Sequence, residues 1–158
     1  MERAGGIPDF DASGNLPPGV YHVSLAETEE RFTWNEARRA LFSGLKRALT
    51  NLARAGVRRV WLDGSFVTAE EEPEDIDGCW EPEPTMDAGK LDPVLLDLAP
   101  PRNPMKSKYG VDFLVAGTRL YDRAAMGKTV EEFFQMDRDM NARGILLLTL
   151  ETSGHDPE

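Results

Sequence analysis

The chain has 158 residues, about the size of one domain. Its 28 acidic residues outnumber its 18 lysines and arginines, and the formal net charge of −10 disfavours passive wrapping of duplex DNA. The single cysteine, Cys79, excludes an internal disulfide framework and a thiolate zinc site. No window approaches the roughly 18 apolar residues of a membrane span, and the N-terminus lacks the apolar core of a signal peptide. We therefore expect a cytoplasmic protein that has no membrane partner.

The N-terminal segment, residues 1–30, is rich in glycine and proline and has no hydrophobic period, so it predicts an irregular arm. A mixed alternation over residues 20–25 adds a short extended piece. Residues 31–152 are expected to form one domain, and residues 153–158 a frayed tail.

The first helix is predicted to begin at Thr33, because Thr33-Trp34-Asn35-Glu36 has the spacing of a capping box. Leucine and alanine recur at steps of three and four residues up to residue 52, while Arg38 and other basic residues occupy other faces. Gly56 stands where a C-terminal glycine cap is expected.

Four further segments are typical of strands: residues 57–62, 75–80, 109–116 and 144–150, which are rich in β-branched and aliphatic residues. Short helices are expected over residues 91–98 and 129–138. The alternation predicts an α/β (α+β) fold, in which a mixed β-sheet is flanked by helices.

Three aspartates in predicted strands are candidate metal ligands. Asp75 and Asp77 alternate with a core-facing Ile76, so their carboxylates would point the same way on a rigid element. Asp112, in Val111-Asp112-Phe113, is the third candidate. Carboxylate oxygens suit Mg²⁺, or Mn²⁺, which completes its shell with water and substrate phosphate. The structural alternative for Asp112 is that its charge keeps an edge strand from pairing with another chain.

Phosphate-binding candidates stand on both sides of this acidic segment. Gly64 lets a backbone amide approach a phosphate, and Ser65 can donate a hydroxyl hydrogen bond. Lys106 and Lys108 could grip phosphates as point charges, or belong to a solvated loop.

Together, these residues resemble the polymerase-beta-like nucleotidyltransferase superfamily, in particular a small, poorly characterised group of minimal bacterial members. The features are Gly64-Ser65 after a strand, a gap of nine residues, Asp75-Ile76-Asp77, and a later acidic residue in a strand. The closer likeness lies in residues 62–68, 75–80, 91–97, 133–135 and 144–145, and spans roughly residues 38–150.

The resemblance implies a nucleotidyltransferase-like fold in which Asp75, Asp77 and Asp112 hold the metal and act in catalysis, and Gly64 and Ser65 hold the phosphates. Minimal members usually place a basic residue shortly after Gly-Ser, whereas acids follow here. The charge of the triphosphate would then be met by other basic residues: Lys106, Lys108, Arg119 or Arg123.

The resemblance also implies an activity: transfer of a nucleoside monophosphate from a nucleoside triphosphate (NTP) to a hydroxyl of RNA such as tRNA, of a protein, or of a small molecule. Several minimal members belong to toxin–antitoxin pairs. An alternative is a catalytically silent module of the same fold that binds a partner protein. A two-metal phosphohydrolase is a weaker reading, because it would need more histidines than His22 and His155.

Overall fold

The computed structural model describes residues 6–121, 125–137, 139 and 141–151. Its centre is a five-stranded sheet with the order β1-β5-β2-β3-β4. Strands β1 and β5 pair in parallel, as do β3 and β4, whereas β2 runs antiparallel to both β5 and β3. The strands are β1 (Gly19–Val23), β2 (Arg59–Asp63), β3 (Ile76–Trp80), β4 (Val111–Val115) and β5 (Gly144–Thr149).

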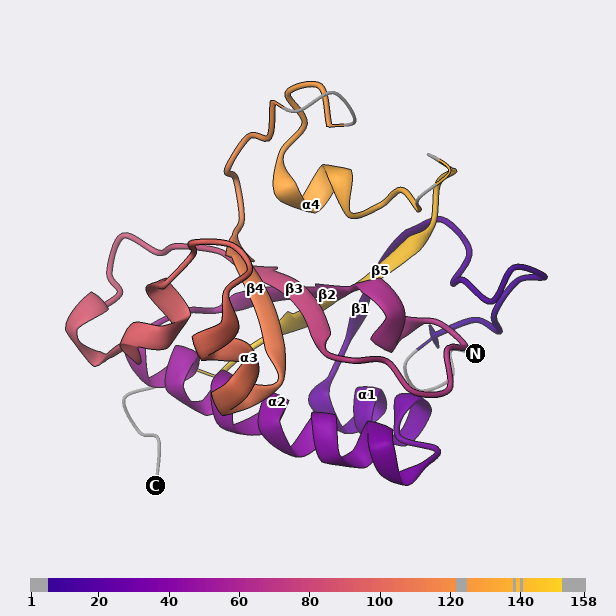
Figure 1. Cartoon of the computed structure of the whole chain (residues 1–158), viewed down its shortest axis with the longest axis horizontal. Coiled ribbons are helices and arrows are strands. Elements are labelled where there is room, and N and C mark those ends of the chain that lie inside the picture. Colours follow the sequence, from indigo (N-terminus) through magenta and orange to yellow (C-terminus); the bar gives the residue numbers. More distant parts are fainter. Residues whose placement is uncertain (1–5, 122–124, 138, 140, 152–158) are drawn as a thin grey trace.

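Helices flank this sheet, so the predicted α/β arrangement of a mixed sheet with flanking helices is confirmed. Helices α1 and α2 lie on one side of the sheet and α4 on the other, and α3 lies beside β4 (Figure 1). Their bounds are α1 (Leu25–Phe32), α2 (Glu36–Ala55), α3 (Asn103–Tyr109) and α4 (Val130–Phe133). Short 3₁₀ turns also occur among the described residues, including η2 (Gly64–Val67), η3 (Ala88–Lys90) and η4 (Pro93–Leu96).

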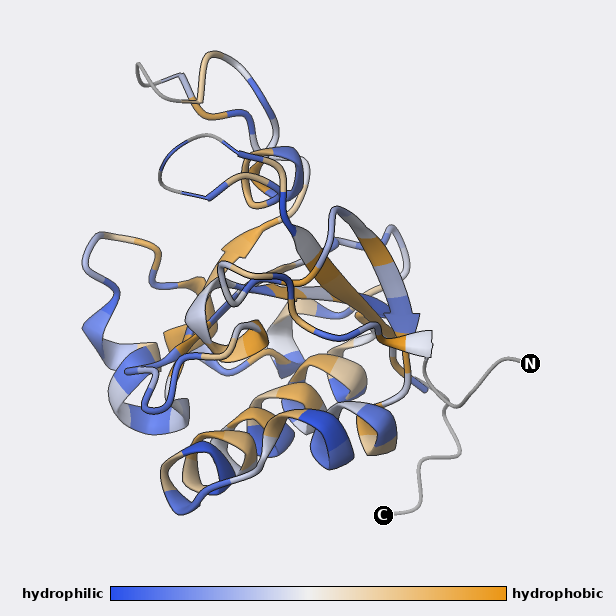
Figure 2. Ribbon diagram, turned by 90° about the vertical axis from the view of Figure 1, so that its right-hand side faces the viewer, coloured by the Kyte–Doolittle hydropathy of each residue, from blue (hydrophilic) through white to orange (hydrophobic). Residues whose placement is uncertain are grey.

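The main hydrophobic core lies between the sheet and α2. Side chains of a strand alternate between the two faces, and the face toward α2 presents fully buried residues such as Ile76, Val111 and Phe113. Helix α2 packs Leu45, Leu52 and other buried residues against this face. The helices beneath the sheet carry both orange and blue residues around their turns, as amphipathic helices do (Figure 2).

The N-terminus of α2 differs from the predicted capping box. Asn35 is the N-cap, and its side chain accepts from the backbone N–H of Arg38. Thr33 instead ends α1, where its hydroxyl donates to the carbonyl of Glu29 at 2.5 Å. The predicted C-terminal glycine is confirmed, since Gly56 has φ 103° and caps α2.

Arg38 was expected on an outer face of its helix, and this expectation is wrong. The side chain is fully buried, and its guanidinium donates to the carbonyls of Phe66, Thr68 and Glu70 at 2.7–3.1 Å. It also stacks 3.7 Å above the Trp34 ring. Burial lowers the pKa of Arg38 to about 10. These bonds fix the loop that follows β2.

The predicted irregular arm of residues 1–30 is also wrong in its second half. Residues Gly19–Val23 form β1, which pairs with β5, and α1 begins at Leu25, with Ser24 and Glu27 forming a capping box. The short extended piece expected over residues 20–25 therefore corresponds to β1, whereas α1 was not expected. The predicted tail, 153–158, lies outside the described residues.

Three other segments differ from the expected pattern. Helix α3 was not predicted, because Pro100, Pro101 and Pro104 had suggested a break, although Pro104 within the first turn is compatible with a helix. The helices expected over 91–98 and 129–138 are shorter, being the turn η4 and the single-turn α4. Among the described residues, no helix combines the length and the apolar composition that crossing a membrane would demand.

Candidate functional site

Three aspartates lie at paired positions on three neighbouring strands. The pairing register sets Asp63 of β2 opposite Asp77 of β3, and Asp77 opposite Asp112 of β4. Residues directly opposite one another project from the same face of a sheet. Here it is the face away from α2, because the neighbours Ile76, Gly78 and Phe113 are buried on the α2 side.

Asp75 joins this row from the residue before β3. One carboxylate oxygen each of Asp75, Asp77 and Asp112 lies within 4.8 Å of the others, and all three residues are half-buried. The structure thus brings together the three aspartates that the sequence singled out. Strand β4 is at the edge of the sheet, as the structural alternative for Asp112 assumed. The Asp112 carboxylate, however, points toward Asp75 and Asp77.

Asp63 is a member of the acidic row that the sequence analysis missed. It was assigned to the turn after the strand, whereas it is the last residue of β2. Only 2% of its surface is exposed, and its Oδ1 has no hydrogen-bond partner among the described residues. Extending the predicted strand by one residue would have placed it on the same face as Trp61 and revealed it.

Burial and mutual repulsion raise the pKa of three of these carboxyls. Burial is the largest cause for Asp77, followed by the charges of Asp75 and Asp112, and together they raise its pKa to about 7. Burial, and then the charge of Asp112, raises the pKa of Asp75. Burial, and then the charge of Asp77, holds the pKa of Asp63 well above its ordinary value. A cation bound here would relieve the repulsion.

Gly64 makes room for the carboxylate of Asp77. Its φ is 74°, which favours glycine, and a Cβ at this position would collide with Asp77 Oδ2. Ser65 follows in the turn η2 and is exposed, while its carbonyl accepts from Arg38 at 3.3 Å. The structure therefore places both residues beside the acidic row.

Three cationic side chains surround the aspartates. Arg102 Nε donates to Asp112 Oδ1 at 2.5 Å. Lys106 Nζ lies 3.7 Å from Asp112 and 3.9 Å from Asp75. Arg143 lies 3.9 Å from the buried Asp63. Of these cations the sequence analysis had named only Lys106, because Arg102 and Arg143 follow no motif and reach the site through the tertiary fold.

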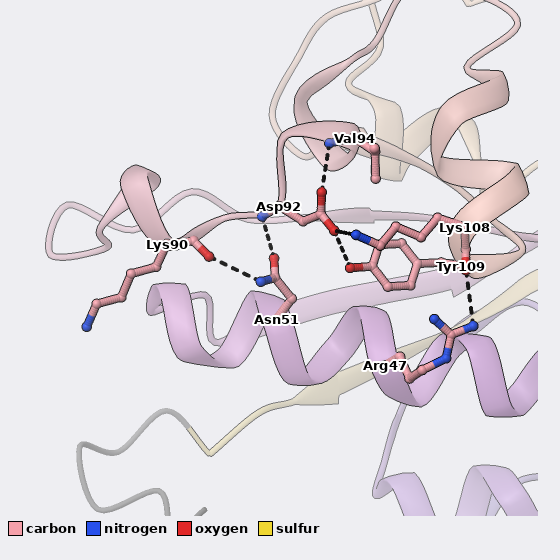
Figure 3. Close-up of polar contacts among 7 residues, drawn as sticks. All are labelled: Arg47, Asn51, Lys90, Asp92, Val94, Lys108 and Tyr109. Carbon is pink, nitrogen blue, oxygen red and sulfur yellow. Dashed lines mark hydrogen bonds and ion pairs between the residues drawn. The ribbon is translucent and has the colours of Figure 1, made fainter.

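Lys108 lies in a different network, on the side of α3 that faces α2 (Figure 3). Its Nζ donates to Asp92 at 2.5 Å, and the hydroxyl of Tyr109 donates to the same carboxylate. Asn51 of α2 accepts from the backbone N–H of Asp92. This network ties α2 to α3, and the structure does not bring Lys108 to the acidic row.

The remaining basic candidates lie outside the acidic row or outside the described residues. Arg119 is exposed and donates to the carbonyl of Gly127. Arg123 and His155 fall outside the described residues, and His22 is exposed on β1. Cys79 is buried, as expected of a small hydrophobic residue.

A pocket of about 210 Å³ opens over the acidic row. Asp63, Asp77 and Asp112 line the side formed by the sheet, and the segment between β4 and β5 forms the opposite wall. The pocket therefore joins carboxylates and guanidiniums to an apolar surface. The other lining residues are Arg102, Leu114, Phe133, Phe134, Met136 and Arg143.

One comparison with known proteins gave a match. The model of a family of unknown function, DUF6932, matches residues 8–149, which is most of the chain. No curated protein and no solved structure matches the chain.

Proposed function

We propose that this chain, which belongs to the DUF6932 family by its match over residues 8–149, is a divalent-metal-dependent nucleotidyltransferase. The reaction is transfer of a nucleoside monophosphate from an NTP to a hydroxyl of RNA, of a protein or of a small molecule. The observation that carries the proposal is the convergence of Asp75, Asp77 and Asp112 beside Gly64 and Ser65.

The donor set suits a hard divalent cation. The candidate ligands are all carboxylate oxygens, which Mg²⁺ and Mn²⁺ prefer. The neighbouring Asp63 adds a buried oxygen without a hydrogen-bond partner among the described residues, and such an orphan is costly unless something pairs with it. Bound at Asp75, Asp77 and Asp112, a divalent ion would neutralise charge on the phosphates.

The residues of the chain have distinct parts in the proposed reaction. The acceptor oxygen forms a bond to the α-phosphorus, the bond from that phosphorus to the bridging oxygen breaks, and pyrophosphate leaves. The proton of the acceptor hydroxyl passes to a carboxylate of the acidic row, for which Asp112 is the candidate. Gly64 and Ser65 offer backbone and hydroxyl donors to the phosphates. Catalysis then rests on positioning and charge neutralisation.

The proposal is tested by labelling. The full chain is incubated with Mg²⁺, each of the four α-labelled ribonucleoside triphosphates, and either total tRNA or cell protein. We expect one pool to become labelled. Asp77→Asn should abolish the labelling, because it removes a ligand from the centre of the row while preserving the shape of the side chain.

The matched control is Asp97→Asn, which changes an exposed aspartate outside the row and should label like the unaltered chain. Undiminished transfer by Asp77→Asn would contradict the proposal. Failure of the chain to label any pool, combined with no Mg²⁺-dependent heat on titration with any triphosphate, would favour the alternative: a catalytically silent module that binds a partner protein, such as the other half of a toxin–antitoxin pair.

A further inference from the structure

The pocket has two chemically different ends. The sheet end carries three aspartates of the acidic row and the guanidiniums of Arg102 and Arg143, whereas the opposite wall presents Phe133 and Met136. We infer that this wall binds the nucleobase of the substrate, with Phe133 as the residue on which the base stacks; the inference rests on the proposed nucleotidyl transfer. It concerns the base end of the nucleotide, which neither the acidic row nor the Gly64-Ser65 turn explains.

Phe133 and Met136 are available to a ligand because the hydrophobic clusters do not use them. On the pocket face, a small cluster forms around Cys79, Ala116 and Val130, and Phe134 packs against it. Among the described residues, neither Phe133 nor Met136 belongs to this cluster or to the main core. Both are half-buried and line the pocket. Phe134 and Val130 thus anchor the segment, while Phe133 and Met136 present an unused apolar surface.

The anchoring holds this wall at a fixed place over the sheet. Glu131 accepts from the backbone N–H of Gly117 at 2.8 Å, and Thr129 and Glu132 form a capping box that begins α4. At the other end, Arg143 donates to the carbonyl of Phe134 at 3.3 Å and lies 3.9 Å from Asp63. A wall that is fixed in advance can bind a rigid, flat ring without the cost of ordering the segment.

The charges set the direction in which a nucleotide enters. The four aspartates and the cations Arg102, Lys106 and Arg143 leave one formal negative charge, which one divalent ion would turn positive. Polyphosphate is therefore favoured at the sheet end once a metal is bound. Arg102 lies there in a left-handed backbone conformation, with φ 60°, and among the described residues its side chain pairs only with Asp112. The base is left for the apolar wall.

The size of the pocket agrees with a partial enclosure. Its volume of about 210 Å³ is below the roughly 300–1,000 Å³ of pockets that enclose a drug-sized ligand. The pocket therefore encloses one part of a nucleotide, and the rest extends toward solvent. A flat aromatic ring that stacks on phenylalanine suits the enclosed part, since stacking tolerates any base.

The experiment compares a ligand that has a base with one that lacks it. The full chain is titrated calorimetrically, in the presence of Mg²⁺, with the best-bound NTP and with inorganic tripolyphosphate. We expect Phe133→Ala to weaken NTP binding by about tenfold, the typical effect of losing one stacked ring, and to leave tripolyphosphate binding unchanged. Phe133→Trp should preserve NTP binding, because it retains a stacking surface.

The control is Tyr121→Ala, which removes another aromatic residue of the same segment; Tyr121 is 77% exposed and does not line the pocket. It should bind both ligands like the unaltered chain. If Phe133→Ala binds NTP as tightly as the unaltered chain, the inference is overturned while the proposed function stands. The same holds if Phe133→Ala loses affinity for NTP and for tripolyphosphate to the same extent. If the unaltered chain binds neither ligand, the proposed function fails and the inference fails with it.

Discussion

The two faces of the sheet differ in the kind of side chain that they bury. On the face toward α2, buried residues are apolar and contact one another, as Phe113 and Val111 do. On the opposite face, Asp63 and Asp77 are buried or half-buried beside other carboxylates, and their pKa values are raised. The same strands build both faces, because alternate residues point to opposite sides.

The packing of the α2 face stabilises the fold that holds the acidic row in place on the opposite face. Like charges at close range oppose folding, as does a buried oxygen that, like Asp63 Oδ1, has no hydrogen-bond partner within the described part of the chain. Within the same part, a small cluster covers this side. The main core and the clamp formed by Arg38 on residues 66–70 supply the compensation. Such a separation of stability from strained polar groups is typical of functional sites.

The largest predicted effect compares adjacent residues of β4. Phe113 is fully buried in the main core, whereas Leu114 is half-buried beside the pocket. We expect Phe113→Ala to lower the free energy of unfolding by about 3–5 kcal/mol, through lost burial and a cavity. Leu114→Ala should cost at most about 2 kcal/mol, the low end for leucine truncation. Urea denaturation of both variants measures the difference. Equal losses would contradict the proposed division between the faces.

The second prediction concerns pH and Asp77. The carboxyl keeps its proton up to a pKa of about 7 in the native state, whereas in the unfolded chain it releases the proton near its ordinary value of 3.8. Between these values the native state binds more protons, so stability falls as pH rises. The fall attributable to Asp77 is roughly 4 kcal/mol at most.

Denaturation from pH 4 to pH 8 in a chelator measures this effect. Compared with the unaltered chain, Asp77→Asn should lose less stability over this range. The amide does not ionise, and its neutrality also removes one of the negative charges that repel the Asp75 carboxylate. Parallel pH profiles of the two proteins would show that the carboxyl is not desolvated as described. Millimolar Mg²⁺ should reduce the loss in the unaltered chain and should have little effect on the variant.

The sequence revealed the parts of this site that depend on short-range patterns. Alternation within one strand suffices to align Asp75 with Asp77, and a strand ending in Gly64-Ser65 marks the turn. That Asp112 joins them depends on β4 pairing in parallel with β3, whereas the strand pattern of the sequence did not show which strands pair.

What the sequence did not reveal depends on tertiary contacts. Arg38 lies in an amphipathic helix among other basic residues, and nothing local distinguishes a buried guanidinium from an exposed one; its carbonyl partners are about 30 residues away. Arg102 and Arg143 reach the pocket only because α3 packs beside β4 and the last loop returns over the sheet. Where β1 lies, the sequence indicated only a short extended piece, because the partner strand β5 lies at the other end of the chain.

The smallest predicted effect separates two lysines that the sequence treated as a pair. Lys106 and Lys108 are two residues apart on α3, a spacing that points side chains in different directions. Lys106 reaches Asp75 and Asp112, whereas Lys108 pairs with Asp92 on the α2 side. Either alanine variant should change the free energy of unfolding by less than about 1 kcal/mol, since both pairs are partly exposed.

Binding of Mg²⁺ and NTP distinguishes the two variants. Lys106→Ala should weaken it by about tenfold, the loss of one charge-assisted contact to phosphate, while Lys108→Ala should leave it unchanged and serves as the matched control. Both are measured by calorimetric titration at fixed ionic strength, because the contact is electrostatic. If Lys108→Ala weakens NTP binding as much as Lys106→Ala does, the phosphates are held on the α2 side of α3. The side chain of Lys108 would then have to leave Asp92 to reach them.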